Sequence, residues 1–131
     1  MANMVRTLAI AAVTASLASA PAQAASEKFG LEYRVERADA GKLTLATCLK
    51  TAEKASADLG FVPANRQTFP GQVAVFASGP RAGGGSLTVY CIAVDRKTAY
   101  VVQALDYNRA HSAAAKRAAD SVHQALLRAA R

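Results

Sequence analysis

The chain of 131 residues contains no tryptophan, and aromatic residues make up only 6% of it. Proteins that bind single-stranded nucleic acid stack the bases on aromatic side chains within a basic groove. No basic strand of this sequence carries interleaved aromatic residues, and we therefore expect no nucleic-acid partner. The sequence also contains no internal repeats.

Cysteine and histidine are scarce, with two residues of each type: Cys48, Cys91, His111 and His123. They form no close pair of the Cys-x-x-Cys kind, which disfavours the alternative of a zinc site built from all four. The sequence thus predicts no metal and no cofactor. No recognisable spacing of Ser, His and Asp accompanies the histidines. Because such triads are spatial, a small hydrolase using a histidine with Asp106 or Asp120 remains an alternative.

The first residues have the layout of a secretory signal peptide. Arg6 precedes an apolar run of about a dozen residues, and the small residues of Ala22-Gln23-Ala24 follow it. The run is too short to span a bilayer stably, and no cysteine follows it to carry a lipid anchor. We expect residues 1–24 to be removed after Ala24, leaving residues 25–131 as one periplasmic or secreted domain that is not an integral membrane protein. The alternative, a buried N-terminal helix, would pack a run that has no polar face.

Export determines how the charges and the cysteines are interpreted. Of the sixteen Lys and Arg only Arg6 lies before position 25, so fifteen basic and nine acidic residues remain, a net charge of +6 that favours anionic surroundings. A lone pair of cysteines in a small exported domain is most often a disulfide. Cys48 and Cys91 are 43 residues apart, and a bond between them would stabilise the fold by about 4 kcal/mol through the loop it closes.

Hydrophobic periodicity predicts four strands and two helices. In "FGLEYRVER" (29–37) the apolar residues alternate with Glu32, Arg34 and Glu36, which we assign to a solvated outer side. Further strands are predicted at 72–78, 86–94 and 98–106, whereas "FVPANRQTFPG" (61–71) has no period and two prolines and is predicted to be a loop. Helices are expected within 43–60 and 111–131, with Thr44 and Ser112 as N-caps.

The order β-α-β-β-β-α predicts an α+β two-layer sandwich, a mainly antiparallel four-stranded sheet with both helices on one face. If Cys91 bonds Cys48 on the inner side of the first helix, then Cys91 faces the helices and its neighbours alternate around it. The far face of the sheet then carries a candidate binding surface of Tyr90, Ile92, Val94, Val101 and Leu105. The alternatives are a register shifted by one residue, or the 61–71 loop covering that face.

The glycine-rich stretch "GPRAGGGS" (79–86) looks at first like a phosphate-binding loop. A Walker loop requires a lysine before the final Ser or Thr and a helix after it, because the lysine and the helix N-terminus both contact the phosphates. Here Gly85 occupies the lysine position and a strand follows. We therefore predict a hairpin loop, in which Arg81 is the candidate contact for any anion.

The last predicted helix is basic on its outer side. Lys116, Arg117 and Arg128 join Arg81 as candidate anion contacts, although an ordinary solvated face would have the same composition.

At "FGLEYRVER", at the single Cys48 of the first helix and at "LTVYCIAV" the chain resembles a small family of exported bacterial proteins known only as a domain of unknown function. The resemblance implies export and the cysteine pair, and no activity, substrate or catalytic residue. The function we expect is a non-enzymatic interaction module of the cell envelope. Its partner would be an envelope protein, a peptide, an anionic envelope component or a second copy in a homodimer.

Overall fold

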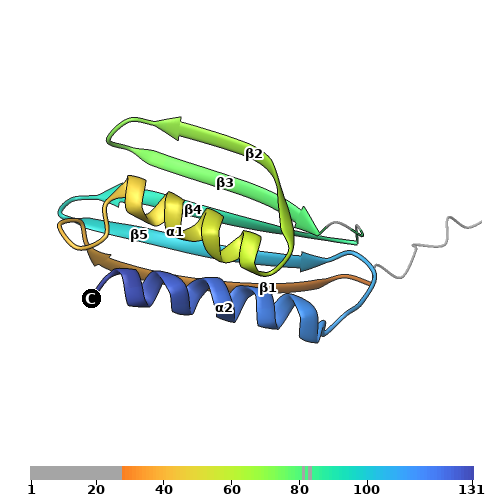
Figure 1. Cartoon of the computed structure of the whole chain (residues 1–131). Helices are drawn as coiled ribbons and strands as arrows, with labels where there is room; N and C mark the ends of the chain where they lie inside the picture. The colour runs from red at the N-terminus through yellow and green to blue at the C-terminus, as the bar shows by residue number, and fades with distance from the viewer. Residues whose placement is uncertain (1–27, 81, 83) are drawn as a thin grey trace, which may run out of the picture.

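The computed structural model describes residues 28–80, 82 and 84–131. Within them the chain forms two helices and five strands: β1 (Gly30–Asp39), α1 (Leu45–Asp58), β2 (Phe61–Phe69), β3 (Val73–Pro80), β4 (Gly85–Val94), β5 (Lys97–Asp106) and α2 (Ala113–Ala129). Figure 1 shows both helices on the same face of one sheet. The predicted α+β two-layer sandwich is therefore confirmed, and the predicted signal peptide lies outside the described residues.

The sheet has five strands in the order β1-β5-β4-β3-β2, and every pair is antiparallel. The prediction of four strands was wrong by one, because the segment predicted as a loop forms β2. Pro63 is tolerated because β2 is an edge strand, and the pairing register shifts between Pro63 and Asn65. An edge strand with little burial carries no alternating pattern, so its sequence resembles a loop.

Each helix begins at the predicted cap. Thr44 Oγ1 accepts a hydrogen bond from the Thr47 N–H at 3.1 Å, and Ser112 Oγ accepts one from the Ala115 N–H at 3.1 Å. These side chains satisfy backbone donors that have no partner inside the helix. Both helix starts are thus fixed by local sequence.

The hydrophobic core lies between the helices and the sheet. Cys48 of α1 and Cys91 of β4 are both fully buried and form the predicted disulfide, with an S–S distance of 2.06 Å. Because both sulfurs are bonded to each other, the alternative zinc site is removed. Ala118 and Ala119 turn inward from α2, and these small side chains let the helix approach the sheet closely.

The sides of β1 are reversed relative to the prediction. Arg34 reaches α2, where its Nη2 lies 2.6 Å from Asp120 Oδ1, so the charged side of the strand faces the helix layer. Leu31 and Val35 pair with Leu105 and Val101 of β5, and their side chains lie on the opposite face. The correction has a physical reason: the flank of α2 that covers β1 carries Asp120, which supplies an ionic partner for Arg34.

Candidate functional site

The face of the sheet turned away from α1 and α2 is not covered by any described element. We call it the open sheet face. It consists of Leu31, Tyr33, Val35 and Arg37 of β1, Ala99, Val101, Gln103 and Leu105 of β5, Thr88, Tyr90, Ile92 and Val94 of β4, Val73, Val75 and Ala77 of β3, and Gln67 and Phe69 of β2. The strand register aligns these residues in rows across the sheet, as in Val35–Val101–Tyr90–Val75.

Large apolar side chains on this face are exposed to solvent. Tyr33 is 62% exposed, Val35 61%, Phe69 52% and Val94 47%. Such residues are normal when scattered singly, but a contiguous apolar patch on a sheet face usually marks a binding surface. The open sheet face is therefore the strongest candidate site in the described part of the chain.

Among the residues described, charged side chains lie at the two ends of the open sheet face and not in its middle. Arg37 lies at one end in β1, beside the ion pair between Asp39 and Lys97. The opposite end carries Phe29 and Tyr107, both exposed, with Lys28 beside them. A partner that covers the middle of the face thus meets no formal charge.

The five residues of the predicted binding surface, Tyr90, Ile92, Val94, Val101 and Leu105, all lie on the open sheet face. Sequence reasoning missed its extension over β1 and β3, to Tyr33, Val35 and Val75. The alternation of β1 was visible, but period two does not say which side is covered. Asp120 could have shown which side of β1 is covered. It is the one acid on the basic last helix, and it forms an ion pair with Arg34.

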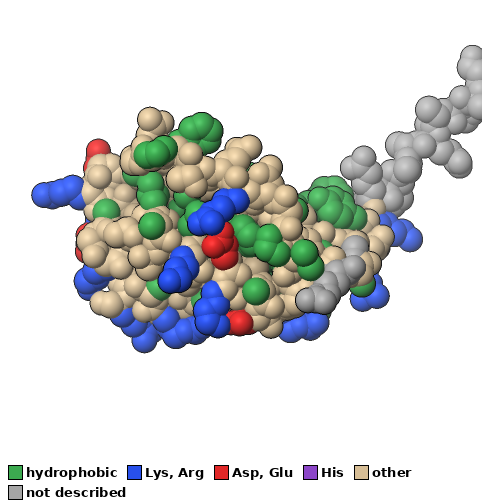
Figure 2. All heavy atoms as spheres, turned by 45° about the horizontal axis from the view of Figure 1, so that its top comes forward, with side chains coloured by type: hydrophobic (Ala, Val, Ile, Leu, Met, Phe, Trp, Pro, Cys, Tyr) green, Lys and Arg blue, Asp and Glu red, His purple; other side chains and the backbone are tan. Residues whose placement is uncertain are grey.

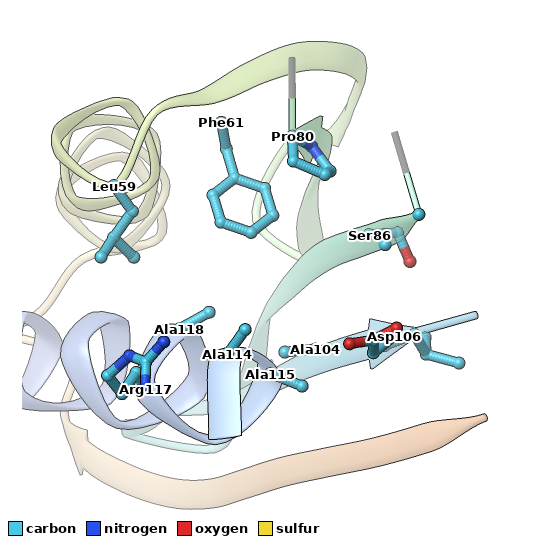
Figure 3. A pocket seen from close by; sticks show the side chains of 13 residues that line it. Leu59, Phe61, Pro80, Ser86, Ala104, Asp106, Ala114, Ala115, Arg117 and Ala118 are labelled. Atoms are coloured by element: carbon cyan, nitrogen blue, oxygen red, sulfur yellow. The ribbon is translucent and has the colours of Figure 1, made fainter. Parts of the chain in front are cut away.

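A pocket of about 330 Å³ opens on the other side of the sheet, between the end of α1 and the start of α2. Figure 3 shows Leu59, Phe61 and Pro80 on one wall and Ala114 and Ala118 on the other, with Arg117 projecting from α2. The lining is mostly apolar, which suits a small hydrophobic group.

Asp106 also lines this pocket, but its carboxylate is used within the fold. Oδ2 accepts a hydrogen bond from Ser112 Oγ at 2.7 Å, and Oδ1 accepts one from the Asn108 N–H at 2.9 Å. Both hydrogen bonds lower the pKa of Asp106, and the bond from Ser112 has the largest effect. The carboxylate therefore stays ionised and orients the N-cap of α2.

The structure does not gather the candidate anion contacts into one patch. Lys116 forms an ion pair with Asp120, which also pairs with Arg34. The hydrogen bond from Lys116 is the largest cause of the lowered pKa of Asp120. Arg128 lies eleven residues beyond Arg117, or about 17 Å along the helix. Arg81 lies outside the described residues. Figure 2 shows basic side chains spread over the surface, with hydrophobic ones between them.

Neither histidine is hydrogen-bonded or ion-paired to an acid in the described part of the chain, and the Nε2 atom of His123 has no hydrogen-bond partner there. His111 is exposed in the turn before α2, where its φ is 54°. His123 is partly buried, and its ring centroid lies 6.1 Å from that of Tyr100. Asp106 and Asp120 are held by Ser112 and by basic side chains, so the hydrolase alternative gains no support here.

None of the described helices is long and apolar enough to cross a membrane. A family model matches residues 28–131, which takes in every described element. The chain belongs to the family of unknown function DUF6180. The predicted resemblance to a domain of unknown function is thereby confirmed. No curated protein matches this DUF6180 chain.

Proposed function

We propose that this DUF6180 domain is an exported, non-enzymatic interaction module of the cell envelope that binds a protein through its open sheet face. One observation carries the proposal: in the described part of the chain a contiguous apolar surface crosses five strands and is uncharged except at its two ends. Burial of apolar area supplies the main favourable free energy of most protein association.

The rest of the molecule suits a rigid platform for such a surface. The disulfide joins α1 to β4, a strand in the middle of the sheet, and the helices cover only the other side. Partners that bind a pre-formed surface lose less conformational entropy than partners that bind a mobile one. The sequence of residues 1–24 supports export, and a buried disulfide accords with an oxidising compartment.

Site-specific photo-crosslinking in living cells tests the proposal. A photoreactive amino acid replaces Val101, at the centre of the open sheet face, and in a control chain it replaces Lys50, an exposed residue of α1. We expect protein adducts from position 101 and none from position 50. Equal adducts from both positions, or none from either, would contradict the proposal.

A further inference from the structure

We propose that the partner of the open sheet face is a second copy of this chain, so that two sheets pack face to face around a two-fold axis. The inference rests on the function proposed above and names its partner. Three features of the described residues carry it: where the charge lies, what kind of polar groups the face presents, and how large the face is.

The charge distribution leaves one surface on which two copies meet without repulsion. The sequence without residues 1–24 has a net charge of +6, and like-charged copies repel when their charged surfaces face each other. Among the described residues, the charges on the open sheet face are Arg37 and the Asp39–Lys97 pair at one end and Lys28 at the other, and none lies in the middle. In a face-to-face pair these groups lie at the rim, where water still solvates them.

The polar groups on the face are self-complementary. Gln103 and Thr88 are register partners on β5 and β4, and Tyr33 pairs with the same Gln103 from β1. Amide and hydroxyl groups each donate and accept hydrogen bonds, so the same group on a second copy can satisfy them. A row of carboxylates or ammonium groups could not do so. This property favours a second copy over a partner of different composition.

The size of the face matches a stable dimer. Strands of ten residues such as β5 are about 33 Å long, and five strands span about 19 Å, so the face measures about 600 Å². Two copies thus bury about 1,200 Å², at the lower end of the range for specific interfaces. Two twisted sheets pack in this way about 10 Å apart, with their strands roughly aligned.

Sedimentation velocity tests the inference on protein purified from cells that express the full-length chain, between about 1 and 100 μM. We expect a reversible dimer. Val101→Glu places a carboxylate at the centre of the face, and we expect it to weaken association by more than about 100-fold, which is 2.7 kcal/mol or more. The matched control Ser121→Glu adds the same charge to an exposed position of α2 and should leave the dimer intact.

A second variant keeps the inference testable if Val101→Glu does not fold. Tyr33→Lys changes a side chain that is 62% exposed, so the fold should tolerate it, and circular dichroism checks both variants. A wild-type protein that stays monomeric overturns the inference. A dimer that survives both Val101→Glu and Tyr33→Lys also overturns it, because another surface, such as the outer edge of β1, would then form the contact.

The crosslinking experiment separates failure of this inference from failure of the proposed function. An adduct from position 101 at twice the mass of the chain supports the second copy. A monomeric protein whose adduct has a different mass overturns the second copy and leaves the proposed function standing. A monomeric protein without adducts overturns both.

Discussion

Breaking the Cys48–Cys91 bond should destabilise the fold strongly without changing it. Both cysteines are fully buried, and the bond closes a loop of 43 residues. In the chain-entropy model such a loop restricts the unfolded chain by about 4 kcal/mol. Domains of this size have free energies of unfolding of about 5–15 kcal/mol, so the reduced protein should remain folded with a small margin.

The assay is urea unfolding followed by circular dichroism, on oxidised protein, on the same protein unfolded, reduced and refolded, and on C48A/C91A. With a slope of about 1.5 kcal/mol per M, the loss of about 4 kcal/mol lowers the midpoint by about 2.7 M. Reduced protein keeps both sulfurs in the core, so its difference from the oxidised form isolates the cross-link. C48A/C91A adds only the effect of the missing sulfur atoms.

Two results would refute this reasoning. A midpoint that falls by less than about 1 M would mean that the cross-link does not act through the unfolded chain. Complete unfolding on reduction would mean that the bond is needed to place α1 on the sheet at all, since α1 then lacks enough packing of its own.

The remaining predictions concern packing, pH and one buried hydroxyl. Gly30→Ala should destabilise by about 1–3 kcal/mol in urea unfolding, because a Cβ there would lie 2.7 Å from a backbone oxygen, whereas Gly41→Ala, with nothing within 4 Å, should change stability little. The lowered pKa of Asp106 stabilises the fold above its unfolded pKa of about 4, and this contribution is lost as the pH falls through the folded value. Asp106→Asn should therefore lower the melting temperature at pH 7 and flatten its decline below pH 4. The Tyr100 hydroxyl is buried without a hydrogen-bond partner in the described structure, and burial raises its pKa to about 12. Tyr100→Phe should stabilise the fold by about 1 kcal/mol, and a loss of stability would instead indicate a bound water between this hydroxyl and His123.

Local sequence determined those parts of the fold that depend on neighbouring residues. Thr44 and Ser112 cap their helices because a side-chain oxygen and a backbone N–H three residues later meet whatever the rest of the chain does. Cys91 could be oriented because a bond to Cys48 requires it to face α1, and strict alternation then places Tyr90 and Ile92 on the other side.

Features that depend on distant partners could not be predicted in the same way. The side of β1 that is covered depends on Asp120, which is 86 residues away from Arg34. The strand state of β2 depends on β3, because its own sequence has two prolines nearby and no alternation. Both errors reduced the predicted apolar surface, and their correction extends it over the whole width of the sheet.

The two edges of the sheet differ, and the difference limits how copies of this chain can assemble. β1 keeps an unbroken register of ten residue pairs with β5, so its outer edge is regular, whereas Pro63 and the register shift disrupt the edge at β2. A continuous ribbon of sheets requires two usable edges in every copy. With one usable edge, any strand addition would be limited to two copies joined through β1. Pro63 and the register shift of β2 thus disfavour the growth of such a ribbon.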